Sequence, residues 1–255
     1  MAEWKSALVT GASSGIGEAI VRRLAADGVP TVVVARRADR LEALAAELPG
    51  IEVLAADLTD RTSLARVEAR VAAGIDLVVN NAGFGTSGPL VEIDADRSTQ
   101  EIELNVVALT RLTRAALPGM IERRRGWIMN ISSVAGFQGA AKFAVYSATK
   151  AYVTSFSEGV HGEVKGHGVI VTAVCPGLTE SEFVSVSRGA DRGPSPMHKM
   201  GFAWQTSDDV AATALADTAK GKTISVPGAL NKAMAGVSSV SPRRVTRFVA
   251  GLLSR

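Results

Sequence analysis

The sequence predicts an α/β domain built on a doubly wound parallel sheet of about seven strands, with helices on both faces. Three observations support this prediction. Short aliphatic runs alternate with longer amphipathic stretches along the chain. These runs are mainly apolar, as is typical of strands that are buried on both faces of a parallel sheet. The length of 255 residues suits one large domain and allows a sizeable core.

The strands of this sheet are expected where β-branched and aliphatic residues cluster, and each helix is expected in the amphipathic stretch that follows. The expected strands are 7–9, 31–35, 51–55, 75–79, 127–131, 169–174 and 223–226. The expected helices are 15–27, 38–48, 60–73, 95–118, 146–165 and 207–219. Ligands bind such sheets at the carboxyl ends of the strands, so the residues that follow each strand are the candidates for function.

Residues 1–255 are expected to form a single domain, because no repeat and no Pro/Ser-rich linker divides them. The stretch 177–206 lacks clear periodicity and is too long for an ordinary connection, so it is interpreted as a functional loop. No run of about 18 apolar residues is present, and the opening MAEWK is too short and polar for a signal peptide. The expected location is therefore the cytoplasm. One cysteine and three scattered histidines predict no metal site and no disulfide framework.

The charge of the chain is distributed unevenly. Residues 218–255 carry seven basic side chains and no acidic one, whereas the rest carries 21 basic and 25 acidic groups. No basic stripe with interleaved aromatic residues marks the main body, so no nucleic-acid binding is expected. The basic tail, about 228–255, shows apolar residues at helical spacing around Phe248. It is predicted to pack on this domain or across a homo-oligomer, and peripheral contact with an anionic membrane is the alternative.

A glycine-rich turn joins the first expected strand to the first expected helix. The sequence from Thr10 to Gly17 reads TGASSGIG. Gly11 allows a tight turn, Gly15 lets backbone N–H groups approach a pyrophosphate, and Gly17 allows close helix–strand packing. The helix N-terminus adds a favourable dipole for an anion. The pattern predicts a dinucleotide site, and the alternative is a simple tight connection.

The end of the second strand indicates which dinucleotide is bound. An acidic residue here would accept a hydrogen bond from the ribose 2′-hydroxyl of NAD, but the sequence has Ala35 followed by Arg36 and Arg37. A guanidinium pairs well with a 2′-phosphate, so NADP(H) is the expected cofactor, with Arg36 as the favoured ligand. The alternative is that both arginines occupy a solvated start of a helix.

Tyr146 and Lys150 are four residues apart in an expected helix and therefore share one face. A lysine ammonium near a phenol favours the phenolate, so Lys150 is expected to lower the pKa of Tyr146 and make it a general acid or base. Ser133 follows the fifth strand and is placed to bind a substrate carbonyl. An exposed aromatic–cation pair is the alternative reading of Tyr146 and Lys150.

Together these motifs resemble the short-chain dehydrogenase/reductase family, in its single-domain branch. The resemblance spans roughly residues 5–227 and adds several marks to those above. These are Asp57-Leu58, Asn80-Asn81-Ala82-Gly83, Asn105, Tyr146-Ser147-Ala148-Thr149-Lys150 and Pro176-Gly177. It implies a Rossmann-type three-layer fold with one dinucleotide-binding catalytic domain.

The resemblance also implies the roles of individual residues. The implied catalytic residues are Ser133, Tyr146, Lys150 and Asn105, of which Asn105 would anchor a water in a proton relay. Asp57 would meet the adenine ring, and Asn80 would support the cofactor and the central sheet. The implied cofactor-binding residues are Gly11, Ser13, Ser14, Gly15, Ile16, Gly17, Arg36, Arg37, Asp57, Leu58, Asn80, Ala82, Gly83, Tyr146, Lys150, Pro176, Gly177, Thr179 and Ser181.

The implied reaction is NADP(H)-dependent interconversion of a ketone or aldehyde and an alcohol. Apolar residues in 177–206, together with Phe84, predict an apolar substrate of acyl, steroid-like or aromatic character. The alternatives are a nonenzymatic NADP-sensing module and a sugar-nucleotide epimerase or dehydratase. The resemblance further implies a homodimer or homotetramer built through the helices expected at 95–118 and 146–165.

Overall fold

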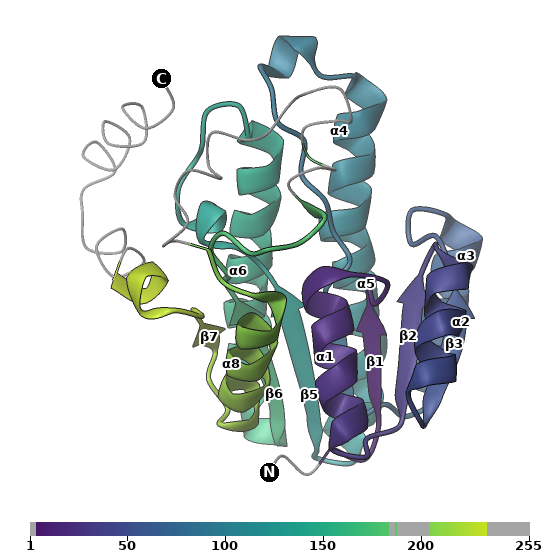
Figure 1. The fold of residues 1–255 in the computed structure, drawn as a ribbon. Helices are drawn as coiled ribbons and strands as arrows, with labels where there is room; N and C mark the ends of the chain where they lie inside the picture. The colour runs from purple at the N-terminus through teal and green to yellow at the C-terminus, as the bar shows by residue number, and fades with distance from the viewer. Residues whose placement is uncertain (1–3, 184–186, 188–203, 234–255) are drawn as a thin grey trace.

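The computed structural model describes residues 4–183, 187 and 204–233. Its centre is a seven-stranded sheet with the strand order β3-β2-β1-β4-β5-β6-β7 (Figure 1). All neighbouring strands run parallel. The strands are β1 (Ala7–Thr10), β2 (Thr31–Ala35), β3 (Ile51–Ala55), β4 (Leu77–Asn80), β5 (Gly126–Ile131), β6 (Val169–Val174) and β7 (Ile224–Ser225). The predicted doubly wound Rossmann-type fold is therefore confirmed.

Helices cover both faces of this sheet (Figure 1). The longer ones are α1 (Gly15–Ala26), α2 (Ala38–Glu47), α3 (Arg61–Ala72), α4 (Ala95–Ile102), α5 (Leu109–Glu122), α6 (Ala144–Val164) and α8 (Ser207–Ala219). A π-helical segment (Glu103–Ala108) joins α4 to α5. Short 3₁₀ turns lie at Leu90–Glu92, Val134–Phe137 and Lys165–His167.

The helix expected at 95–118 differs most from the observed elements. It contains the π-helical segment at Glu103–Ala108, and it continues past Pro118 to Glu122. The last turn is retained because Met120 is fully buried, where it packs closely on the first residue of β5, Gly126. Burial of an apolar side chain thus outweighs the local cost of proline in this helix.

The core has two parts, one on each face of the sheet. Successive residues of β1 point to opposite faces, so Ala7 and Val9 contact one cluster and Leu8 contacts the other. The first cluster includes buried residues of α1, α2 and α8, and the second includes those of α3, α5 and α6. The strands β1, β2, β4, β5 and β6 are almost completely buried, which explains why their sequences are mostly apolar rather than alternating. The edge strand β3 is partly exposed and carries Glu52.

The strand order reverses between β1 and β4. The chain leaves β1 toward β2 and β3, then crosses back to place β4 on the other side of β1. Doubly wound sheets bind ligands in the crevice outside this point. The glycine-rich turn after β1 and the Asn80–Gly83 segment after β4 meet there.

Parts of two predicted segments lie outside the described residues. They are 184–186 and 188–203 of the expected loop, and 234–255 of the expected basic tail. The two ends of the loop are described, and they are joined by a bridge between Thr179 and Gln205. In the part of the chain that the structure describes, no helix is long and apolar enough to cross a membrane.

Candidate active site

The glycine-rich turn is built as its sequence predicts. Gly11 and Gly15 adopt positive φ angles of 66° and 59°, which glycine tolerates best. Gly17 has another reason to be glycine, because a Cβ there would lie 2.4 Å from the Gly11 carbonyl oxygen. The Asn81 side chain donates hydrogen bonds to the carbonyls of Thr10 and Gly11, at 2.9 and 3.2 Å. The turn is thereby fixed against the segment that follows β4.

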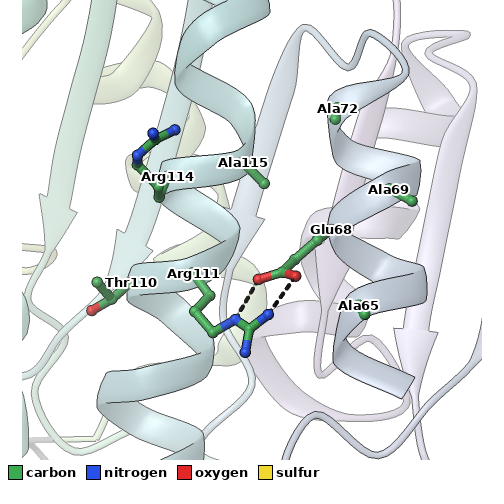
Figure 2. A pocket seen from close by; sticks show the side chains of 8 residues that line it. All are labelled: Ala65, Glu68, Ala69, Ala72, Thr110, Arg111, Arg114 and Ala115. Carbon is green, nitrogen blue, oxygen red and sulfur yellow. Dashed lines mark hydrogen bonds and ion pairs between the residues drawn. The ribbon is translucent and has the colours of Figure 1, made fainter. Parts of the chain in front are cut away.

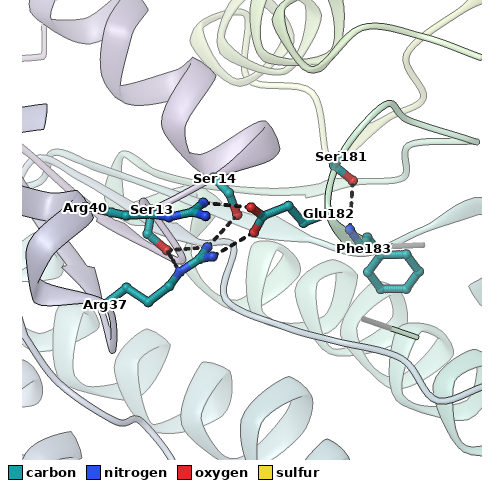
Figure 3. A network of polar contacts seen from close by, with 7 residues as sticks. All are labelled: Ser13, Ser14, Arg37, Arg40, Ser181, Glu182 and Phe183. Atoms are coloured by element: carbon teal, nitrogen blue, oxygen red, sulfur yellow. Dashed lines mark hydrogen bonds and ion pairs between the residues drawn. The ribbon is translucent and has the colours of Figure 1, made fainter. Parts of the chain in front are cut away.

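Arg37 reaches back over this turn (Figure 3). Its Nε and Nη2 donate to Ser13 Oγ at 3.2 and 3.0 Å, and Nη2 also donates to Ser14 Oγ at 3.1 Å. Arg36, which the sequence favoured as the anion ligand, is exposed instead. The guanidinium that lies against the turn is therefore that of Arg37.

One cavity connects the predicted motifs at the carboxyl ends of the strands. Its volume is about 790 Å³, within the range of small-molecule and cofactor sites. Residues that follow β1, β2 and β3 line one part, and those that follow β4, β5 and β6 line the other. The lining includes Gly11, Ser13, Ser14, Gly15, Ile16, Arg36, Arg37, Asp57, Leu58, Ala82, Gly83, Ser133, Tyr146, Lys150, Pro176, Gly177, Thr179 and Ser181.

Three residues of the predicted site are not among those that line the cavity, namely Gly17, Asn80 and Asn105. Asn80 is buried and donates from Nδ2 to Asn130 Oδ1 on the neighbouring strand, at 2.8 Å. Asn105 lies in the π-helical segment, where it donates to Thr149 Oγ1 at 3.1 Å and to the Phe84 carbonyl at 2.8 Å. Its Oδ1 accepts from the Phe84 N–H at 3.1 Å. The contacts of Asn80 and Asn105 hold the frame around the cavity.

Tyr146 lies on α6 with its ring between aromatic neighbours and the backbone. The centroid of its ring is 5.1 Å from that of Phe183 and 6.1 Å from that of Phe143. A Cβ on Gly85 would lie 2.8 Å from its Cδ2, so the chain passes directly over the ring. Removal from water raises the pKa of the Tyr146 phenol to about 12, although a hydrogen bond with Ser133 acts in the opposite direction.

Lys150 shares this face of α6 and is buried. Its Nζ lies 5.7 Å from the centroid of the Tyr146 ring and donates to the Ile131 carbonyl at 2.8 Å. Burial lowers the pKa of Lys150 to about 8, because the charged form loses its hydration.

The lowered pKa expected for Tyr146 is not seen in this structure, and Lys150 is not among the groups that shift the pKa of the phenol. The pKa of the phenol rises instead of falling. The physical reason is that burial penalises the phenolate and the ammonium alike, since each loses its hydration. Spacing of four residues predicted the shared face correctly, but it carries no information on how much water reaches either group.

Ser133 lies two residues past the end of β5 and is the N-cap of the 3₁₀ turn Val134–Phe137. Its Oγ accepts from the Ala135 N–H at 3.1 Å and donates to the Pro176 carbonyl at 3.5 Å. Pro176 lies two residues past the end of β6, and its carbonyl also accepts from Val134 N at 3.0 Å. Ser133 and Tyr146 both line the cavity, where a carbonyl oxygen could accept hydrogen bonds from the two hydroxyls.

Several residues of this region were missed by the sequence analysis. Arg97 lines the cavity with its guanidinium carbon 3.9 Å from the centroid of the Phe84 ring. Glu182 also lines it and pairs with Arg37 (Figure 3). Phe143 contacts Tyr146 from three residues upstream. The only sequence signal for Phe143 was its position just before the helix expected at 146–165.

Glu101 is a further missed residue, and it is fully buried in α4. Among the described residues, neither of its carboxyl oxygens has a hydrogen-bond partner of good geometry. Burial raises the pKa of this carboxyl, whereas Thr86, Arg97 and Lys150 act to lower it. Its charge in turn raises the pKa values of Tyr146 and Lys150, so Glu101 belongs to the electrostatic environment of the site.

We expect Glu101→Gln to stabilise the protein at neutral pH, by about 1 kcal/mol. Because the pKa of Glu101 is raised on folding, the folded state holds its proton more tightly than the unfolded chain. Stability is therefore lost as the pH rises from the ordinary value of 4.5 through the raised pKa. Urea unfolding at neutral and at acid pH measures this effect. The gain from Gln should vanish in acid, and an equal gain at both pH values would contradict the argument.

A second hollow lies between α3 and α5 (Figure 2). Half of its eight lining residues are alanines, and the Arg111 guanidinium and the Glu68 carboxylate form an ion pair across it. None of its eight lining residues belongs to the predicted site. This hollow is therefore separate from the candidate active site.

The fold and the cavity define a class of dinucleotide-binding oxidoreductases with a tyrosine and a lysine on one helix. The family model for short chain dehydrogenase matches residues 5–191. Serine 3-dehydrogenase from Agrobacterium fabrum is 36% identical over 211 residues, which cover 81% of this chain and 84% of that protein. The chain belongs to the short-chain dehydrogenase/reductase family.

Solved structures agree with this membership. A short-chain dehydrogenase from Sphingobium yanoikuyae, in complex with NADPH, is 34% identical with a TM-score of 0.80. The alignment covers 93% of this chain and 96% of that one. A bulky-bulky ketone specific alcohol dehydrogenase from Comamonas testosteroni is 32% identical with a TM-score of 0.77, covering 94% and 95% of the two chains.

Proposed function

We propose that this protein is an NADP(H)-dependent oxidoreductase that interconverts a carbonyl compound and an alcohol in one catalytic domain. The observation that carries the proposal is the single cavity lined by the glycine-rich turn, by Arg37, and by Ser133, Tyr146 and Lys150. The binding of NADPH by the similar dehydrogenase from Sphingobium yanoikuyae supports the choice of cofactor.

The residues present fit such a cofactor. A close approach of backbone to ligand requires glycines, and a Cβ at Gly11 would lie 2.9 Å from Ala82 Cα. Gly15, Ile16 and Gly17 begin α1, whose N-terminus favours a pyrophosphate. Arg37, with Ser13 and Ser14, offers a cation and hydroxyls for a 2′-phosphate. Arg36, at the edge of the cavity, adds a second cation.

The rest of the cavity would hold the adenine and nicotinamide ends. Asp57 and Leu58, after β3, would meet the adenine ring, while Ala82 and Gly83 line the middle. Lys150 would hold the ribose next to the nicotinamide. Pro176, Gly177, Thr179 and Ser181 line the cavity after β6, where they would hold the carboxamide.

When bound, NADPH would supply a hydride to the carbonyl carbon, and NADP⁺ would accept one from the carbon that bears the alcohol hydroxyl. In the reducing direction, Tyr146 gives its hydroxyl proton to the carbonyl oxygen, and in the oxidising direction its phenolate takes the proton from the alcohol. Ser133 donates a hydrogen bond to the same oxygen and so stabilises the charge that develops there. Asn105 positions the Phe84–Gly85 segment above the tyrosine ring.

The substrate is proposed to be an apolar ketone. Phe84, Phe143 and Phe183 surround the Tyr146 side of the cavity, which supports aryl or acyl groups next to the carbonyl. The bulky ketones named for the similar Comamonas testosteroni enzyme support the same choice. Assembly as a homodimer or homotetramer remains a prediction from the family resemblance, and a cytoplasmic location remains a prediction from the sequence.

The proposal is tested by titrating the purified protein with NADPH and NADH by fluorescence. We expect Arg37→Ala to weaken NADPH binding by about 10- to 100-fold, because a charge-assisted contact is lost, with little change for NADH. Arg66→Ala, an exposed arginine on α3, is the matched control. Equal loss for both cofactors would contradict the assignment of the 2′-phosphate site.

Turnover is tested separately with acetophenone, ethyl acetoacetate and L-serine, following the absorbance of NADPH or its appearance from NADP⁺. Turnover of a ketone would support the proposed substrate class, and turnover of L-serine alone would overturn it. Tight NADPH binding without turnover of any carbonyl compound would favour the NADP-sensing alternative.

A further inference from the structure

The proposed 2′-phosphate site already contains an anion from the protein itself. Glu182 follows β6 in sequence, yet its carboxylate lies beside the helix that follows β2 (Figure 3). Its Oε2 accepts from Arg37 Nη1 at 2.8 Å, and its Oε1 accepts from Arg40 Nη1 at 2.7 Å. These two arginines lower the pKa of the Glu182 carboxyl, so it carries its negative charge at neutral pH.

Of the two arginines that bind Glu182, Arg37 also lies on the glycine-rich turn. The Nη1 of Arg37 contacts Glu182, while its Nε and Nη2 contact Ser13 and Ser14. A phosphate that used Arg37 at this turn would therefore lie close to the Glu182 carboxylate. The carboxylate and the phosphate repel each other when both contact the Arg37 guanidinium. Either the Glu182 carboxylate moves away from Arg37, or the phosphate binds weakly.

We propose that Glu182 is an internal competitor of the cofactor 2′-phosphate, which must displace it from Arg37 and Arg40. This inference rests on the proposed function and adds a residue that sets the preference for NADP(H) over NAD(H). Displacement is feasible because the side chains are accessible, with 40% of Arg37, 46% of Arg40 and 41% of Glu182 exposed. Ion pairs at such exposure contribute little, whereas a phosphate brings more charge and more acceptor oxygens.

Displacement of the Glu182 carboxylate would also affect the part of the cavity next to Tyr146. Phe183, the next residue in the chain, has its ring centroid 5.1 Å from that of Tyr146. Two hydrogen bonds fix the chain just before Glu182. The Glu180 N–H donates to the Gln205 carbonyl at 2.9 Å, and Ser207 Oγ donates to the Glu180 carbonyl at 2.8 Å. Glu182 thus lies in the chain between Glu180, which these hydrogen bonds fix, and Phe183, which contacts the Tyr146 ring. Release of its carboxylate by a 2′-phosphate would loosen residues 181–183.

The first experiment compares the Kd values of NADPH and NADH for the wild type and Glu182→Gln by calorimetry. Removal of the competing charge should tighten NADPH binding about three- to tenfold and leave NADH unchanged. Glu180→Gln is the matched control, because this exposed carboxylate is two residues away in the same segment. The same comparison is made without nicotinamide by using 2′,5′-ADP and ADP as ligands. Glu182→Gln should bind 2′,5′-ADP more tightly than the wild type does and should bind ADP equally well.

Each other outcome overturns the inference. Unchanged or weaker NADPH binding by Glu182→Gln would show that the carboxylate does not compete. Weaker NADH binding would show that Glu182 instead accepts from the ribose hydroxyls, as an acid at this place does in NAD enzymes. Absence of binding by either cofactor to the wild type would refute the proposed function itself, so the two failures are distinguishable.

Hydrogen exchange of the wild type provides a second measurement. NADPH should increase amide exchange in a peptide that covers residues 178–183, relative to NADH at equal saturation. Equal exchange with both cofactors would contradict displacement by the 2′-phosphate.

Discussion

Tyr146→Phe is expected to reduce kcat by about a thousandfold while NADPH binds as it does to the wild type. The substitution removes only the hydroxyl that is proposed to exchange a proton with the substrate oxygen. Its ring keeps its neighbours Phe143 and Phe183, at 6.1 and 5.1 Å between centroids. Steady-state rates with the best ketone of the panel, together with NADPH titration and thermal unfolding, measure the effect.

Tyr152→Phe is the matched control for this experiment. Tyr152 lies on the same helix, and its hydroxyl bonds only with Thr110 Oγ1, at 3.0 Å, among the described residues. It is 40% exposed and does not line the cavity, so its loss should change kcat by less than about twofold. A Tyr146→Phe protein that kept more than a tenth of the wild-type rate would rule out Tyr146 as the essential acid and base.

Much of the fold could be predicted because a strand that is buried on both faces is a continuous run of mostly apolar residues. Val169–Val174 illustrates this, since five of its six residues are buried. The glycine-rich turn could be predicted for a similar reason. Positive φ angles at Gly11 and Gly15, and the lack of space at Gly17, are local demands that only glycine meets.

The partners of charged side chains could not be predicted in this way. Arg36 and Arg37 are adjacent, and only the direction of the chain after β2 decides which guanidinium contacts Ser13. Glu182 is 145 residues away from Arg37, so no local pattern connects them. Glu101 falls in a helix whose other side chains are mostly polar, so its complete burial has no signal in the sequence.

The pKa of Tyr146 shows a related limit. Helical spacing predicts that Tyr146 and Lys150 share a face, and both line the cavity. The direction of the pKa shift depends on how much water each group loses, which in turn depends on Phe183, Gly85 and the π-helical segment. These elements come from separate parts of the chain. The sequence therefore predicts the candidate catalytic residues more readily than it predicts their pKa values.

Gly17→Ala is expected to destabilise the protein by about 2 kcal/mol and to weaken NADPH binding at least about tenfold. An added Cβ would meet the Gly11 carbonyl oxygen and Asn81 Nδ2, each at 2.4 Å. The carbonyl belongs to the backbone of the turn, so the conflict cannot be relieved by rotating a side chain. Either α1 moves away from β1 or the turn loses the geometry that would bind the pyrophosphate. Thermal unfolding and NADPH titration measure the two effects.

Gly159→Ala should have the opposite effect on stability, which makes it the informative control. Gly159 lies in α6, it is exposed, and a Cβ there would meet nothing within 4 Å. Alanine is the better helix former, so a gain of about 0.5–1 kcal/mol is expected, with unchanged NADPH binding. If both substitutions stabilised the protein, the turn would have room that the structure does not show. If Gly17→Ala lowered stability without weakening NADPH binding, close packing of α1 on β1 would matter for folding but not for the cofactor site.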